Sequence, residues 1–259
     1  MAGQGKDVTD GEGYDSATLE LTGNQEDLVK AVVETGTPTV VVLVNGRPLA
    51  TRWVAEHVPA ILESWIPGEQ GGQAVADILF GDNNPSGRLS ITVPRHAGQL
   101  PVFYNYRPSK AYWLEHGWGK PYVDMSPEPL FVFGHGLSYT RFEYSNLRIE
   151  PQAGWPGDTV RVVVDVQNTG GRAGAEVVQL YLHVPVSSST RPVRQLRGFR
   201  MVPLNPGEKQ TVRMELGPEE LSLLDRDMRW VVEPGKYEVR VGSSSKDIRL
   251  TGTFEIKNR

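Results

Sequence analysis

The sequence contains no cysteine, so neither disulfide bonds nor thiolate chemistry can contribute to its stability or function. This absence leaves the compartment undetermined, because a cysteine-free chain is stable in reducing and in oxidising surroundings. No apolar run approaches the roughly 20 residues that a membrane-spanning helix needs. The net charge of −4 and the pI near 5.8 give no electrostatic reason to expect nucleic acid or an anionic membrane as a partner.

Several kinds of site are also missing from the sequence. The five histidines are scattered, with no pair at ligand spacing, so no metal site is predicted. Neither nucleotide-binding fingerprint is present, so no cofactor is predicted. Residues 1–15 are polar and glycine-rich, without the basic and apolar regions of a signal peptide. They are expected to lead into a helix without an opening strand.

Between about residues 20 and 95, helical and strand patterns alternate. Thr22, with Gln25 three positions later, is typical of a capping box, and the apolar spacing beyond it predicts a helix that ends at Gly36. The continuously apolar run 39–44 predicts a strand buried on both faces, as in a parallel sheet. Residues 60–66 are a second candidate strand.

The same half of the chain continues with a helix and a further strand. The apolar spacing over 74–79 predicts a helix that ends at Gly81. Leu89, Ile91 and Val93 alternate with polar residues, which predicts a half-exposed edge strand. The region is therefore predicted to be α/β.

Residues 96–143 show few periodic segments and are rich in aromatic residues. Such a long irregular stretch is usually functional or wraps another domain. The rings could line an outer binding subsite or cover a domain junction, and both interpretations stay open. They are Tyr104, Tyr106, Tyr112, Trp113, Trp118 and Tyr122.

From about Tyr144 the pattern becomes purely β. Apolar and polar residues alternate over 160–166, 178–182 and 237–241, with turn signals between these runs. Short strands at this spacing are typical of an immunoglobulin-like or fibronectin-type sandwich. The predicted domains are thus 1–143, with the aromatic region at about 96–143, and 144–259.

Three motifs follow one another along the chain. They are PGEQGG with ADILFGDNNPSGRL at 67–89, FGHGLSY at 133–139, and NTG with GAEVVQLY at 168–181. Together they resemble the C-terminal part of glycoside hydrolase family 3, of the β-glucosidase and β-xylosidase type. The resemblance implies the end of an α/β sandwich domain followed by a fibronectin-III-like β-sandwich. It also implies a (β/α)8-like barrel, which carries the nucleophilic aspartate and has no counterpart in these 259 residues.

The resemblance also implies where the general acid/base lies. In the family it is a glutamate on a loop of the second domain, and the matching segment here is 11–16. Glu12 is therefore the candidate acid/base, on a loop within about residues 1–20, with Asp10 and Glu20 as weaker alternatives. Tyr14 and Asp15 are candidate substrate-binding residues. Arginine often follows this aspartate in the family, whereas this chain has Ser16.

The resemblance implies part of a retaining, exo-acting β-glycosidase that releases terminal β-linked glucose or xylose. Its partners would be a polypeptide carrying the barrel and a small carbohydrate substrate, and a homo-oligomer stays open. The chain alone is expected to be inactive. The competing hypothesis is a non-catalytic carbohydrate-binding or scaffold module, in which the fibronectin-like domain is a spacer.

Overall fold

The computed structural model of the protein describes residues 2–3, 13–108 and 122–258. The chain forms two compact units. The first consists of Met1–Asn83, Ile91–Val102 and Asp124–Phe131, and the second of Asn84–Ser90, Phe103–Val123 and Val132–Arg259. This partition differs from the predicted domains 1–143 and 144–259, whose boundary stays a prediction.

The first unit is an α/β structure. Its elements are β1 (Ala2–Gly3), α1 (Gln25–Glu34), β2 (Val40–Val44), α2 (Arg52–His57), β3 (Ala60–Glu63), α3 (Gly71–Phe80) and the 3-10 helix η1 (Ala97–Gln99). The strands pair in parallel in the order β1-β2-β3. Val41 and Leu43 of β2 pack with Val29 of α1 and Val54 of α2 in one buried cluster. The helices thus bury the apolar residues of a parallel strand, as the run 39–44 predicted.

Two predictions about the start of this unit are wrong. An opening strand does exist, because Ala2 and Gly3 pair in parallel with Leu43 and Val44. The capping box is not formed, since α1 begins at Gln25 with Asn24 as its N-cap. The Thr22 hydroxyl instead accepts a hydrogen bond from the Gln25 side chain at 3.0 Å.

Two predicted strands also end differently in the structure. β3 stops at Glu63 rather than at residue 66, since Trp65 adopts a left-handed backbone with φ of 51° that cannot continue a strand. Residues 89–93 form no edge strand. Val93 makes an isolated bridge with Phe131, and Leu89 pairs through its backbone with Gly134 and His135. The alternation of apolar and polar residues over 89–93 therefore does not correspond to a continuous strand pairing.

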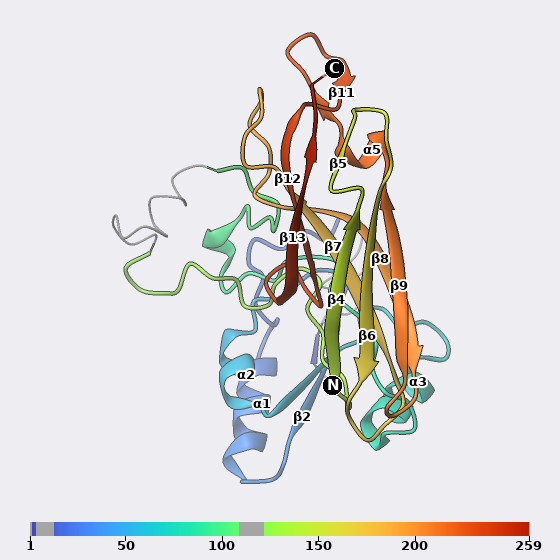
Figure 1. The fold of residues 1–259 in the computed structure, drawn as a ribbon. Helices are drawn as coiled ribbons and strands as arrows, with labels where there is room; N and C mark the ends of the chain where they lie inside the picture. Colours follow the sequence, from blue (N-terminus) through green and yellow to red (C-terminus); the bar gives the residue numbers. More distant parts are fainter. Residues whose placement is uncertain (1, 4–12, 109–121, 259) are drawn as a thin grey trace. The chain divides into compact units, whose positions relative to one another are not determined.

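The second unit is dominated by a β-sandwich. Its elements are β4 (Phe142–Glu150), β5 (Ala153–Gly154), β6 (Val160–Asn168), β7 (Gly174–His183), β8 (Gln195–Leu204), β9 (Lys209–Leu216), α5 (Pro218–Leu221), β10 (Leu223–Leu224), β11 (Trp230–Val231), β12 (Gly235–Gly242) and β13 (Ile248–Ile256). One sheet has the order β5-β13-β12-β7-β8 and the other β4-β6-β9. Figure 1 shows β4, β6 and β9 side by side.

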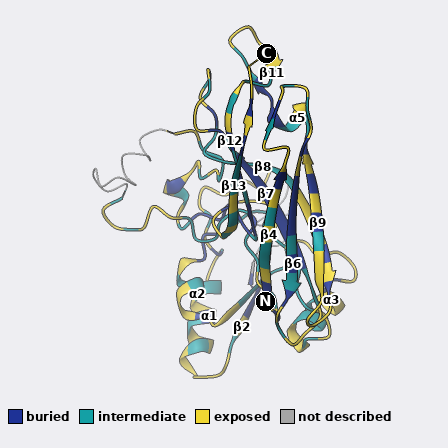
Figure 2. Ribbon diagram, viewed as in Figure 1, coloured by how far each residue is buried: buried dark blue, intermediate teal, exposed yellow. Residues whose placement is uncertain are grey.

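Side chains from both sheets fill the space between them. Val160, Val162, Val164 and Val166 of β6 are fully buried, and they meet the alternating apolar residues of β7 and β12 in one core. Figure 2 shows buried residues along β6 and an alternation of buried and exposed residues along β9. The fold is therefore α/β followed by an all-β sandwich, which confirms the predicted class.

Gly72 within α3 and Gly81 at its C-cap allow a matched test of which backbone positions require glycine. Gly81 ends the helix with φ of 82°, a left-handed conformation, whereas Gly72 lies inside the helix with open space around its missing Cβ. We expect Gly81→Ala to lower the free energy of unfolding by about 1 kcal/mol. Gly72→Ala should raise it by about 0.5 kcal/mol, because alanine favours the helix. Urea unfolding followed by circular dichroism measures both, and equal signs would contradict this account of the cap.

Candidate functional site

The structure describes only part of the predicted acid/base loop. Glu12 and Asp10 lie outside the described residues, so their placement is not part of the structure. Tyr14, Asp15 and Glu20 are described, and all three are exposed. The roles assigned to Glu12, Tyr14 and Asp15 therefore stay predictions.

Two contacts hold the segment that follows Glu12 on the first unit. Arg47 donates a hydrogen bond from Nη2 to the carbonyl oxygen of Tyr14 at 2.8 Å. The backbone N–H of Ala50 donates to the carbonyl of Leu19 at 2.6 Å. Arg47 and Ala50 follow β2, so the loop is fixed to the stretch directly beyond a strand of the parallel sheet.

Polar side chains gather at the same end of this sheet. Asn45, fully buried after β2, donates from Nδ2 to the carbonyl of Arg47 at 2.6 Å and to Glu63 Oε2 at 3.4 Å. The backbone N–H of Trp65 donates to Glu63 Oε1 at 3.0 Å. Burial raises the pKa of the Glu63 carboxyl, and these two hydrogen bonds offset part of that rise. In open parallel sheets, ligands bind beyond the carboxyl ends of the strands.

The FGHGLSY motif packs closely against β7 and the segment 84–90. A Cβ on Gly134 would approach the Gln179 side chain to 2.1 Å, and one on Gly136 would approach the Gly87 carbonyl to 2.3 Å. Gln179 donates to the carbonyl oxygens of Gly134 and Ser243. Both glycines are thus required by close approach rather than by chemistry. His135 lies between these two glycines, and both its burial and the positive charge of the neighbouring Arg88 lower its pKa.

Tyr104, in the aromatic stretch, has a structural role in the second unit. The Tyr104 ring stacks on Phe133 with centroids 4.0 Å apart and meets Tyr181 edge-on at 6.0 Å. Its hydroxyl oxygen accepts a hydrogen bond from the Leu196 N–H at 3.2 Å. Tyr112, Trp113 and Trp118 lie outside the described residues.

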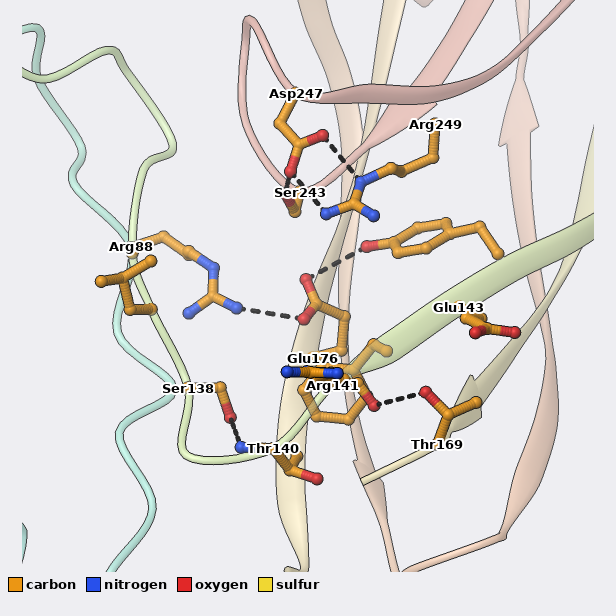
Figure 3. A pocket seen from close by; sticks show the side chains of 14 residues that line it. Arg88, Ser138, Thr140, Arg141, Glu143, Thr169, Glu176, Ser243, Asp247 and Arg249 are labelled. Atoms are coloured by element: carbon orange, nitrogen blue, oxygen red, sulfur yellow. Dashed lines mark hydrogen bonds and ion pairs between the residues drawn. The ribbon is translucent and has the colours of Figure 1, made fainter. Parts of the chain in front are cut away.

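The second unit contains a buried charged cluster that we call the Glu176 cluster: Glu176, Arg88 and Tyr144. Arg88 Nη2 lies 3.2 Å from Glu176 Oε2, and the Tyr144 hydroxyl donates to Oε1 at 3.1 Å (Figure 3). The Arg88 and Glu176 side chains are only 7% and 5% exposed. Burial raises the pKa of Glu176, while Arg88 and Tyr144 oppose that rise. Burial and the Glu176 charge likewise raise the pKa of Tyr144.

A second charged pair lies beside this cluster. Arg249 contacts Asp247 through two nitrogens, each 2.7 Å from a different carboxylate oxygen, and the Ser243 hydroxyl donates to Asp247 at 2.7 Å (Figure 3). Burial opposes ionisation of Asp247, but the hydrogen bonds from Arg249 and Ser243 outweigh it and lower the pKa of this carboxyl. The pair is therefore ionised at neutral pH.

The Glu176 cluster and the Asp247–Arg249 pair line a pocket of about 400 Å³. Figure 3 shows the two groups on its walls, with Arg141, Ser138 and Thr169 on the side formed by the start of β4 and its neighbouring loops. Pockets that bind small molecules typically have volumes of about 300–1,000 Å³.

Sequence reasoning did not identify Arg88, Glu176 or Tyr144 as a site. The sequence nevertheless contained a signal. Glu176 is spaced by two residues from Val178 along β7, in series with the apolar Leu180 and Leu182, so it lies on the same face of the strand as they do. Successive side chains of a strand alternate between faces, so a carboxylate on the apolar face must be paired or protonated. Its partner could not be found this way, since Arg88 lies 88 positions away.

The described residues contain no cluster of His, Asp or Glu suited to holding a metal ion. None of the helices in the described ranges has the length and apolar character needed to cross a bilayer.

We expect Arg88→Met to lower the free energy of unfolding by about 3 kcal/mol at pH 7.5, because it leaves a buried carboxylate unpaired. The pKa of Glu176 in the folded chain would then rise further above its unfolded value. The stability of the folded state should therefore recover as the pH falls and Glu176 takes up a proton. Urea unfolding at several pH values measures this.

The control for this substitution is Arg161→Met. Arg161 pairs with Glu215 at 3.6 Å on the same unit, but both side chains are more than half exposed. Its removal should change the free energy of unfolding by less than about 1 kcal/mol. A similar loss in both variants, or a loss in Arg88→Met that does not vary with pH, would contradict the burial argument.

Comparison with known proteins identifies related chains. Residues 1–139 match the model of the glycosyl hydrolase family 3 C-terminal domain, and residues 176–245 match that of the fibronectin type III-like domain. A β-xylosidase of Formosa agariphila is 45% identical over 238 residues, which are 92% of this chain and 32% of that protein. A periplasmic β-glucosidase of Salmonella typhimurium is 40% identical over 252 residues, covering 95% and 32%.

Solved structures give the same result. A β-glucosidase from Listeria innocua in complex with glucose matches with a TM-score of 0.92 and 38% identity, over 99% of this chain and 36% of that chain. A β-glucosidase from Erythrobacter marinus matches with a TM-score of 0.87 and 43% identity, over 94% and 31%. The chain thus spans about a third of the length of these relatives.

Proposed function

The chain belongs to glycosyl hydrolase family 3, and on that premise we propose that it is part of a retaining, exo-acting β-glycosidase. The enzyme releases terminal β-linked glucose or xylose from oligosaccharides or glycosides. One observation carries the proposal: relatives named β-xylosidase and β-glucosidase align with nearly the whole chain.

Retaining hydrolysis needs two carboxyl groups about 5 Å apart, one to attack the anomeric carbon and one to protonate the leaving oxygen. In the proposal, Glu12 is the second of these. It protonates the leaving group in the first step and activates water in the second. The nucleophile is an aspartate on a barrel domain that these 259 residues do not include. Tyr14 and Asp15 contribute to binding the sugar.

The acid must be protonated when substrate binds, so its pKa must lie near or above the working pH. A carboxyl on a polar loop gains this only from burial or from a nearby negative charge. Both influences come from the barrel, where the nucleophile's charge lies close to Glu12 once the two parts are joined. Catalysis therefore depends on the barrel in two ways, for the nucleophile and for the pKa of the acid.

The contacts of the loop support this assignment. The bonds from Arg47 to Tyr14 and from Ala50 to Leu19 hold the segment directly after Glu12 on the parallel sheet. A carboxyl delivered to another domain requires such anchoring, because a displacement of about 1 Å can cost a hundredfold in rate. Arg47 is thus a positioning residue, since it acts through the loop backbone.

We expect Glu12→Ala, in the enzyme that joins this chain to its barrel, to slow hydrolysis most for substrates with poor leaving groups. Aryl glycosides with good leaving groups need little protonation and should lose less. Azide should restore part of the rate and yield a glycosyl azide, which steady-state kinetics and product analysis would show.

The variant for comparison is Asp10→Ala, which removes an alternative candidate for the acid/base; if Glu12 is the acid, this variant should leave the leaving-group dependence unchanged. Kinetics of Glu12→Ala equal to those of the parent enzyme would remove Glu12 from the site. If the joined protein showed no hydrolysis but still bound carbohydrate, the competing function of a non-catalytic binding or scaffold module would replace the proposal.

Loss of the anchoring bond should affect the rate rather than substrate binding. We expect Arg47→Ala in the joined enzyme to lower kcat by roughly tenfold or more, with a smaller change in KM, because the acid is less well placed. Arg47→Lys should restore part of kcat, since an ammonium group can still donate to a carbonyl. Arg52→Ala, which removes an exposed arginine paired with Glu56, is the control and should leave both constants unchanged. An equal effect of Arg47→Ala and Arg52→Ala would contradict the positioning role.

A further inference from the structure

The pocket in the second unit has the size and composition of a ligand site. Its volume of about 400 Å³ lies within the usual range for small-molecule pockets. Its lining combines carboxylate acceptors, guanidinium and hydroxyl donors, and the apolar side chains of Leu137 and Phe142. These kinds of group match a ligand that carries both hydroxyl groups and C–H faces.

The charges that line the pocket cancel. Three arginines, Arg88, Arg141 and Arg249, stand against three carboxylates, Glu143, Glu176 and Asp247. A net charge of zero gives neither an anion nor a cation an electrostatic advantage. A neutral ligand that can both donate and accept hydrogen bonds is favoured instead.

The polar groups on the walls are held in place before any ligand binds. Arg88 and Tyr144 fix the Glu176 carboxylate, and Arg249 and Ser243 fix Asp247. Groups that are already ordered lose little conformational entropy on binding.

We propose that this pocket binds a neutral polyhydroxylated ligand, specifically a single pyranose unit of a carbohydrate. Each sugar hydroxyl both donates and accepts, so vicinal hydroxyls can bond a fixed carboxylate and a neighbouring arginine together. Such binding follows from the lining of the pocket alone and does not require the proposed hydrolytic function.

The first test is binding of methyl β-D-glucopyranoside to the 259-residue chain, followed by amide chemical shifts in NMR spectra. We expect a dissociation constant in the millimolar range, on the order of 1–10 mM. The shifted amides should include those of residues 138–144 and 243–249. Thr169→Trp, at an exposed position of the pocket lining, should fill the pocket and raise the dissociation constant roughly tenfold or more.

The second test changes the charge of the pocket without changing its volume. Asp247→Asn leaves three arginines facing two carboxylates, so the lining carries a net charge of +1. The neutral glucoside should then bind more weakly, whereas methyl β-D-glucuronoside, which has the same ring with a carboxylate, should bind more tightly than it does to the parent chain. Asp227→Asn is the matched control, because Asp227 also pairs with an arginine two positions on but lies outside the pocket lining.

The proposal is overturned if the parent chain binds no neutral glycoside at about 50 mM, well above the expected dissociation constant. It is equally overturned if binding occurs but neither Thr169→Trp nor Asp247→Asn changes it, which would place the sugar elsewhere on the chain. If Thr169→Trp does not fold, the preference of Asp247→Asn for glucuronoside over glucoside decides the matter alone.

Discussion

The ion pair between Arg88 and Glu176 places two charges where water barely reaches them. Moving such charges out of water costs several kcal/mol for each ion, and only close contact and full hydrogen bonding repay it. The pair therefore tolerates one arrangement of segment 84–90 against β7 far better than any neighbouring one. Tyr144 of β4 completes the arrangement by donating to the same carboxylate.

Other polar contacts reinforce this arrangement. Asn84 accepts hydrogen bonds from the Ser138 hydroxyl and the Tyr139 N–H, and it donates to the carbonyl of Ala173. Gln179 is bonded to the carbonyls of Gly134 and Ser243. Segments that are distant in sequence are thus held on the sandwich by side-chain amides and charges rather than by strand pairing. The walls of the proposed sugar pocket are fixed by these same contacts.

Periodicity predicted those elements whose burial follows from their own sequence. The run 39–44 became a buried parallel strand and the alternating valines of β6 became core. The predictions that were wrong concerned segments whose hydrogen-bond partners lie far away in the sequence. The N-terminal residues Ala2 and Gly3 carry no strand pattern, yet they pair with β2. Residues 89–93 do alternate, but their backbone bonds go to 131–135 and form no continuous ladder.

The residues of the candidate site likewise differ in how far the sequence alone could predict them. Glu12 was assigned through the family resemblance and lies outside the described residues, whereas Arg47, which anchors the loop, carries no sequence signal because its partner is a backbone carbonyl 33 positions away. The position of Glu176 on the apolar face of β7 could have been recognised from the sequence, but its ion pair with Arg88 is visible only in the structure.

The central claim is that this chain provides an acid/base whose nucleophile lies on a barrel elsewhere. Hydrolysis of an aryl β-glucoside and an aryl β-xyloside by the purified 259-residue chain, alone and after addition of a polypeptide carrying the barrel, tests it most directly. The account predicts no turnover by the chain alone and turnover once the barrel is present. Turnover by the chain alone would contradict it.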